Sequence, residues 1–194
     1  MQKLLKNKLV VFLALAVIIY ILWDVFYTYV IGGYTNIDNA VSFNLAYISN
    51  GMLQMFGYDS VVDYLRMEDF IIVRMTDSIY PGVRIGNPCN GLSLFGLFAS
   101  VVIAFPSQRK DKWLFNYHKL WFIPLGIVFI HLINAIRIAI LTVIASYNFE
   151  ALNFNHDVTF KIVTYAIIFI LWYFWINKFS GFNFKKNKRN ETVG

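Results

Sequence analysis

The sequence predicts an all-α polytopic membrane protein with about four transmembrane helices and an outward-facing segment that contains a surface helix and a small β-hairpin. Two observations support this fold class. First, 58% of the 194 residues are hydrophobic and only 14% are charged, and the apolar residues occur in long runs. Second, the basic residues gather between these runs, all on one side of a four-helix topology. We therefore expect one membrane-embedded domain over residues 1–194.

Four apolar stretches are long enough, or nearly long enough, to cross a bilayer, which takes about 20 mostly apolar residues. They are residues 9–30, 91–105, 120–146 and 160–176. The second is short, at roughly 22 Å as a helix, so we expect its N-terminal flank to lie at the membrane interface. No small-residue cleavage site follows the first stretch, which is therefore predicted to be an uncleaved anchor.

The basic residues orient the predicted helices. They form three groups: Lys3, Lys6 and Lys8; Arg109, Lys110, Lys112 and Lys119; and Lys178, Lys185, Lys186, Lys188 and Arg189. The positive-inside rule places all three groups, and with them both termini, in the cytoplasm, with residues 178–194 as a basic tail. The net charge of +6 is then mostly anchoring, and we expect no nucleic-acid partner.

Residues 32–88 are predicted to face outward and to have structure of their own. Apolar positions at mixed helical spacing over 37–55 predict a helix that lies on the membrane surface. Residues 70–75 and 83–86 are β-prone and flank turn-forming residues, so they predict a hairpin that leads directly to Cys89. The sequence has no metal-ligand spacing and no phosphate-binding loop, and we expect neither a metal nor an organic cofactor.

Cys89 is the only cysteine of the chain and the first candidate for chemistry. Asn87 is a good N-cap and Pro88 a good first helical residue, which predicts Cys89 in the first turn of a helix. Unsatisfied N–H groups at that end favour negative charge, so a thiol there ionises more easily and becomes a nucleophile. The alternative is that Cys89 is a small buried apolar residue.

Arg137 and His156 are expected to reach the same level of the membrane as Cys89. Arg137 lies near the outer end of the third stretch, and His156 immediately precedes the fourth. A thiol, an imidazole and a guanidinium together can perform acyl transfer: His156 exchanges protons and Arg137 stabilises an oxyanion. Asn134 and Asp157 are candidates for orienting Arg137 or the substrate.

Each of these residues also has a structural interpretation. Arg137 could be a snorkelling interfacial anchor, His156 a solvated loop residue, and Asp157 a helix cap. His131 lies deeper in the third stretch, and we expect it to be a hydrogen bonder between packed helices. The joint placement of these residues on one side of the membrane favours the functional interpretation.

The residues Cys89-Asn90-Gly91-Leu92, then Asn134-Ala135-Ile136-Arg137-Ile138, then His156, resemble the exosortase/archaeosortase family, in the compact form of Bacteroidetes-like bacteria. The resemblance implies a membrane-embedded cysteine transpeptidase that cleaves the C-terminal sorting signal of exported proteins through a thioester. It also implies that Cys89 is the nucleophile, Arg137 the oxyanion or substrate-orienting group and His156 the acid/base, with Asn90 beside the nucleophile as a further orienting residue.

The expected location is the bacterial cytoplasmic membrane, with the active site facing the periplasm or exterior. The implied partners are proteins that carry a C-terminal motif, a transmembrane helix and a basic tail, together with membrane lipids and an envelope lipid or glycan as acceptor. Two other classes remain open: a non-enzymatic membrane scaffold or assembly factor for envelope export, and a transporter whose polar path is lined by His131, Asn134 and Arg137.

Overall fold

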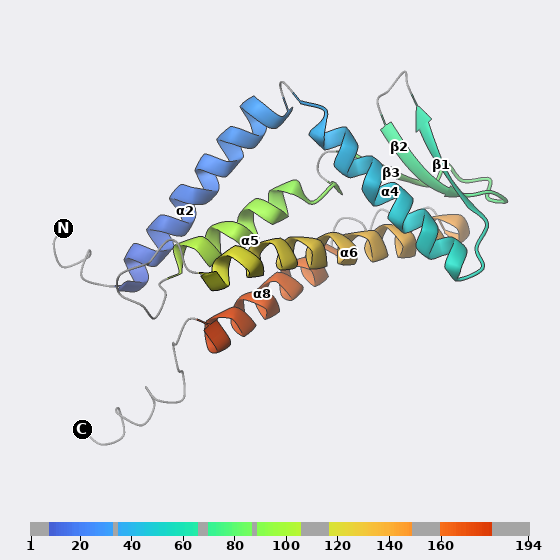
Figure 1. The fold of residues 1–194 in the computed structure, drawn as a ribbon. Coiled ribbons are helices and arrows are strands. Elements are labelled where there is room, and N and C mark those ends of the chain that lie inside the picture. Colours follow the sequence, from blue (N-terminus) through green and yellow to red (C-terminus); the bar gives the residue numbers. More distant parts are fainter. Residues whose placement is uncertain are drawn as a thin grey trace.

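The computed structural model describes residues 8–32, 35–65, 70–86, 89–105, 117–148 and 160–179, which form a mostly helical protein with a small sheet at one end (Figure 1). The long helices are α2 (Lys8–Phe26), which continues as a π-helical turn η1 (Tyr27–Ile31), α5 (Leu92–Ala104), α6 (Tyr117–Tyr147) and α8 (Phe160–Phe179). Each corresponds to one of the four predicted apolar stretches.

Two of these helices are long and apolar enough to cross a membrane, over Val10–Ile31 and His118–Tyr147. The apolar parts of α5 and α8 are shorter, at Leu92–Ala104 and Ile162–Asn177. α2 packs on α5, and α6 packs on both α5 and α8. Close approach of the first pair requires Gly96, because a Cβ at that position would overlap the ring of Trp23.

The chain passes back and forth along one direction. The start of α2, the end of α5, the start of α6 and the end of α8 lie at one end of the molecule, whereas the sheet and helix α4 (Ile37–Met55) lie at the other (Figure 1). Helix α4 has the bounds predicted for the surface helix.

The sheet contains the predicted hairpin and one strand that the sequence did not reveal. Strands β1 (Ser60–Leu65), β2 (Phe70–Met75) and β3 (Val83–Ile85) are antiparallel in the order β1-β2-β3. β1 was missed because Asp63 interrupts its apolar residues, yet the Asp63 carboxylate pairs with Arg74 on β2 at 2.6 Å.

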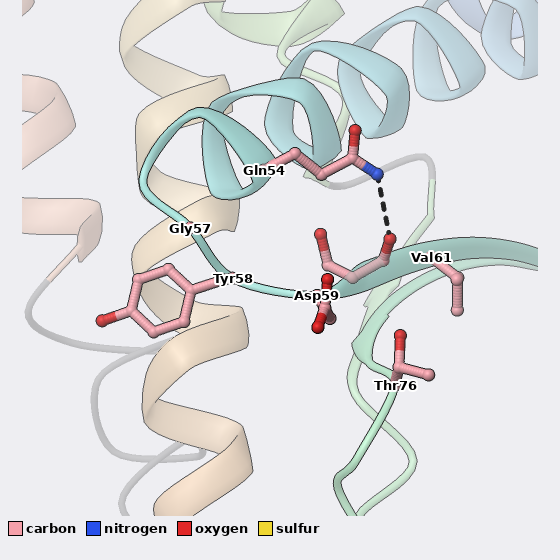
Figure 2. Close-up of a pocket in the computed structure, with 7 residues that line it drawn as sticks. Gln54, Gly57, Tyr58, Asp59, Val61 and Thr76 are labelled. Atoms are coloured by element: carbon pink, nitrogen blue, oxygen red, sulfur yellow. Dashed lines mark hydrogen bonds between the residues drawn. The ribbon is translucent and has the colours of Figure 1, made fainter.

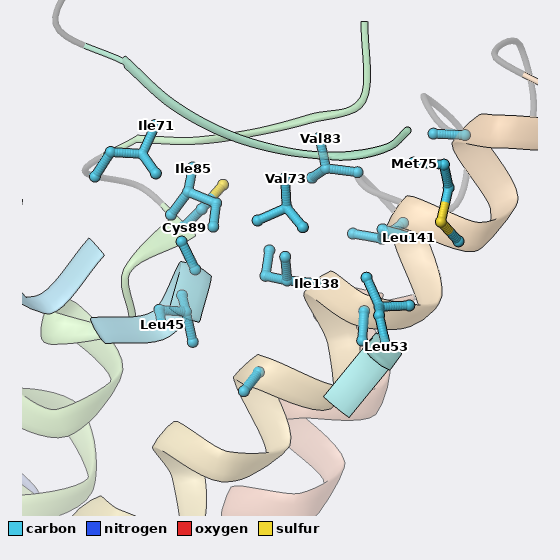
Figure 3. Packing of buried hydrophobic residues seen from close by; sticks show 14 residues of the cluster. Leu45, Leu53, Ile71, Val73, Met75, Val83, Ile85, Cys89, Ile138 and Leu141 are labelled. Atoms are coloured by element: carbon cyan, nitrogen blue, oxygen red, sulfur yellow. The ribbon is translucent and has the colours of Figure 1, made fainter. Parts of the chain in front are cut away.

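One face of the sheet is covered by α4 and α6. Leu45 and Leu53 of α4 and Ile138 of α6 meet Val73 of β2 in a single buried cluster (Figure 3). Between the two helices, the Ser49 hydroxyl donates a hydrogen bond to the carbonyl oxygen of Ala135 at 3.0 Å. Helix α4 and the sheet are therefore packed onto the C-terminal half of α6, and Cys89 belongs to the same cluster.

A second apolar cluster fills the other half of the bundle, between α5, α6 and α8. It includes Phe98, Phe122, Ile168 and Trp175. At its edge Lys119, which we expected to be a solvated cytoplasmic anchor, is only 4% exposed and donates hydrogen bonds to the carbonyl oxygens of Ile103 and Phe105, at 2.7 and 2.8 Å. Lys119 thus caps the C-terminal end of α5.

Candidate functional site

Cys89 lies just before α5 and not in its first turn. α5 begins at Leu92, and Gly91 occupies the position before it with φ of 87°. The prediction that Cys89 lies in the first turn of α5 is therefore wrong, whereas Asn87 and Pro88, the predicted cap and first helical residue, lie outside the described residues. The physical reason is Gly91: its left-handed backbone breaks the chain direction between Cys89 and the helix.

The Cys89 residue is nearly covered, at 8% exposure. It belongs to the apolar cluster of the sheet, α4 and α6, where Figure 3 shows it together with Ile85 and Leu45. Its backbone N–H donates to the Gly86 carbonyl oxygen at 2.8 Å. Cys89 thus occupies a tight turn between the end of the sheet and the start of α5.

Asn134 connects this turn to Arg137. The Asn134 side-chain amide donates a hydrogen bond to the Cys89 carbonyl oxygen at 2.7 Å, and its own oxygen accepts one from the Arg137 guanidinium at 3.3 Å. Both residues lie on α6, one helical turn apart, so one face of this helix presents both groups to the turn. The structure thus brings Cys89 together with two other predicted site residues, of which Asn134 lies 45 positions further along the chain.

The Arg137 guanidinium is buried, and within the described part of the chain no carboxylate forms an ion pair with it. It is 8% exposed, its Nε has no hydrogen-bond partner, and the ion pair that the described residues form is the one between Arg74 and Asp63. An Arg side chain stays protonated, and burying a charge without compensation is costly. A buried guanidinium of this kind is able to stabilise a negative charge that forms nearby.

The Asp38 carboxylate, which was not among the predicted site residues, contacts the turn from the side of α4. Asp38 of α4 is 6% exposed, and its Oδ1 accepts hydrogen bonds from the Asn90 amide at 2.6 Å and from the Tyr27 hydroxyl at 2.7 Å. The Asn90 oxygen in turn accepts the backbone N–H of Leu92 at 3.0 Å. An acidic residue near an apolar span was the available signal, but the sequence analysis predicted only a surface helix over 37–55 and did not single out Asp38.

His131 is separate from this network. Its Nε2 hydrogen-bonds the Asn44 side-chain oxygen at 2.9 Å, and its ring meets that of Phe95 edge to face. Both partners come from other helices, as expected for a residue that joins packed helices. His131 also lines an apolar groove of about 490 Å³ between α4, α5 and α6, where Val128 and Leu132 are further lining residues.

His156 and Asp157 lie outside the described residues, so the predicted acid/base has no described position. A separate polar pocket of about 550 Å³ lies where α4 meets β1, lined by Gln54, Tyr58, Asp59 and Thr76 among others (Figure 2). None of the predicted site residues lines it. Within the described ranges, no three His, Cys, Asp or Glu side chains are grouped so that they could hold a metal ion.

The Cys89 turn thus combines a thiol, two amides and two buried charged groups of opposite sign. No protein-family model, curated protein or solved structure matches this chain. What the site can do must therefore be inferred from its own residues. In general, a thiol can serve as a nucleophile toward a carbonyl carbon, and a guanidinium can stabilise the oxyanion that forms; here Asn134 links the two residues that carry these groups.

Proposed function

We propose that this chain is a membrane-embedded cysteine transpeptidase or protease of the exosortase type, which cleaves the C-terminal sorting signal of exported proteins. The observation that carries the proposal is the buried guanidinium of Arg137, which no described carboxylate pairs with and which Asn134 links to the Cys89 backbone. A residue whose task was only packing or anchoring would gain from pairing this charge or from reaching water.

The proposal includes four membrane passes, with α5 and α8 crossing in addition to the two longer spans. The alternating direction of α2, α5, α6 and α8 supports it, because it puts the start of α2 and the end of α8 on the same side (Figure 1). Helix α5, with 13 residues, measures only about 20 Å, so the bilayer thins there or the Cys89 turn lies at membrane depth. The sheet then faces the periplasm or exterior.

The proposed chemistry uses Cys89 and Arg137, together with His156 as the acid/base that the family resemblance implies. The Cys89 sulfur, as thiolate, attacks the carbonyl carbon of the substrate's peptide bond, and the carbonyl oxygen becomes an oxyanion opposite the Arg137 guanidinium. The C–N bond then breaks, and the leaving amine takes a proton from His156. The remaining thioester is attacked by an amine or hydroxyl of an envelope lipid or glycan, or by water, which releases the product and restores the thiol.

One observation favours the second candidate, a non-enzymatic scaffold for envelope export. Cys89 is 8% exposed and packs with aliphatic side chains, as an ordinary buried cysteine does. A scaffold, however, has no need for a buried unpaired Arg137 beside it. The two candidates differ in whether the thiol itself is required.

The deciding experiment compares cells that carry the native chain with cells that carry Cys89→Ala. C-terminal peptide mapping of exported proteins measures the fraction that retains a C-terminal transmembrane helix and basic tail. We expect cleavage of this segment to be lost in Cys89→Ala, while the variant reaches the membrane at the native level. Retained cleavage would reject the transpeptidase and leave the scaffold.

A further inference from the structure

Asp38 is a buried acid that the proposed chemistry does not use. Its Oδ1 accepts two hydrogen bonds, whereas its Oδ2 is buried and has no hydrogen-bond partner. Burying a carboxylate costs free energy, and the hydrogen bonds that it accepts offset this cost. The bonds of Asp38 are therefore the features to explain. Its strongest contact, at 2.6 Å, is with Asn90, the residue that directly follows Cys89.

The orientation of the Asn90 side chain makes Asp38 necessary. The backbone N–H of Leu92 can only donate, so it fixes the oxygen of the Asn90 amide toward α5. The NH₂ end must then point to Asp38, and it requires an acceptor there. An amide held at both ends cannot rotate, and the chain on either side of it is held with it.

The backbone around Cys89 is therefore held from three directions. Asp38 of α4 holds Asn90, Asn134 of α6 holds the Cys89 carbonyl oxygen, and Gly86 holds the Cys89 N–H. The two charged residues each act through one amide: Asp38 through Asn90, and Arg137 through Asn134.

We propose that Asp38 is a positioning residue, which sets the direction of the Cys89 thiol by holding Asn90. This inference rests on the transpeptidase function proposed above and extends it to a residue of the outward segment. The carboxylate acts as a hydrogen-bond acceptor in this role, so its oxygen and not its charge is required. The hydroxyl of Tyr27 meets the same oxygen from the first membrane helix and provides the matched control.

The test compares four variants by peptide mapping of cleavage and by thermal unfolding in detergent. Asp38→Ala and Asn90→Ala each remove the link to the turn, and we expect each to slow cleavage by about 100-fold, the effect of a displacement near 1 Å at a reacting group. Asp38→Asn keeps an acceptor oxygen and should retain most of the native rate. Tyr27→Phe removes the other bond to Oδ1 and should retain cleavage, although it lowers the unfolding temperature.

The double variant separates positioning from a general loss of structure. If Asp38 acts through Asn90, Asp38→Ala slows cleavage no further in an Asn90→Ala background. Additive losses, native cleavage in Asp38→Ala, or failure of Asp38→Asn to retain cleavage would overturn the inference. Should Asp38→Ala not reach the membrane, Asn90→Ala alone decides, because it breaks the same bond and leaves the bond between Asp38 and Tyr27.

A substrate-independent measurement distinguishes this inference from the proposed function. The rate at which a small maleimide alkylates Cys89 should rise in Asp38→Ala and in Asn90→Ala, since the turn that covers the thiol is released, and should stay native in Tyr27→Phe. If native and Cys89→Ala cells show the same C-terminal peptides, the transpeptidase fails, and the alkylation rates still decide whether Asp38 holds the turn. Equal rates in the native chain and Asn90→Ala would reject that role.

Discussion

Lys119 and Arg137 are two buried cations on the same helix, and their surroundings differ. Lys119, near the start of α6, is 4% exposed and donates to two carbonyl oxygens at the end of α5. Arg137, about 27 Å further along, is 8% exposed and makes one side-chain bond of 3.3 Å, longer than the usual value near 2.9 Å. Its Nε has no partner in the described part of the chain.

We interpret Lys119 as a structural charge, whereas the proposed function gives Arg137 a role in the chemistry. The fold completes the surroundings of Lys119, since the carbonyl groups that α5 leaves unpaired are the ones it binds. For Arg137 the described residues supply one side-chain partner, Asn134, and none for its Nε. Hydropathy alone cannot distinguish the two, because both are single basic residues at the margins of an apolar helix.

The largest expected effect tests this comparison directly. Arg137→Gln removes the guanidinium but keeps a polar side chain, and we expect cleavage of the C-terminal segment to slow by about 10² to 10³-fold, as for loss of an oxyanion donor. Its free energy of unfolding should stay near native or rise, because a buried unpaired charge is removed. Peptide mapping and thermal unfolding in detergent measure the two quantities.

Lys119→Gln is the matched control. It leaves the carbonyl groups of Ile103 and Phe105 without their charged donor, so the protein should lose about 1–3 kcal/mol of stability, with cleavage by the folded fraction unchanged. If Arg137→Gln destabilised the protein as Lys119→Gln does and cleavage stayed native, the two cations would be equivalent and the contrast would be lost.

A smaller effect is expected at Gly91, which lies between Cys89 and α5. Its φ of 87° favours glycine, and a Cβ there would lie 3.3 Å from the Asn134 amide nitrogen. Gly91→Ala should therefore destabilise the protein by about 1–2 kcal/mol and displace the amide that links Arg137 to Cys89. We expect slower cleavage and a changed rate of Cys89 alkylation.

Gly57→Ala is the control that separates the contact with Asn134 from the backbone strain. Gly57 has a similar φ of 83°, but nothing lies within 4 Å of the position of its Cβ. The two variants should lose similar stability, whereas only Gly91→Ala should alter Cys89. Native alkylation and cleavage in Gly91→Ala would show that the Asn134 contact is not needed to place the thiol.

The sequence predicted the elements better than their contacts. The helix over 37–55 and the hairpin before Cys89 were predicted because apolar periodicity and turn residues are local signals. The strand at Ser60–Leu65 was missed because its stability depends on pairing with β2, which no local pattern reveals. The number of membrane crossings stays a prediction for α5 and α8.

For the site, sequence spacing placed Asn134 and Arg137 on one face of a helix, and topology predicted their approach to Cys89. It did not predict the start of α5, which begins at Leu92, after the left-handed Gly91. It also did not predict Asp38, because the bond to Asn90 joins residues 52 positions apart. Interactions of that range depend on packing of the whole outward segment against α6.

The smallest expected effect concerns His131, which the transporter alternative places on a polar path with Arg137. In the structure His131 and Asn44 satisfy each other beside an apolar groove. Either His131→Leu or Asn44→Leu leaves one partner unsatisfied and should cost about 0.5–1.5 kcal/mol, whereas the double variant should recover most of this loss because neither polar group remains. Cleavage should stay native in all three. A loss of cleavage in His131→Leu as large as in Arg137→Gln would mean that both residues serve one polar path. The distinction on α6 between Arg137, which is linked to the Cys89 turn, and His131, which is a packing contact, would then be wrong.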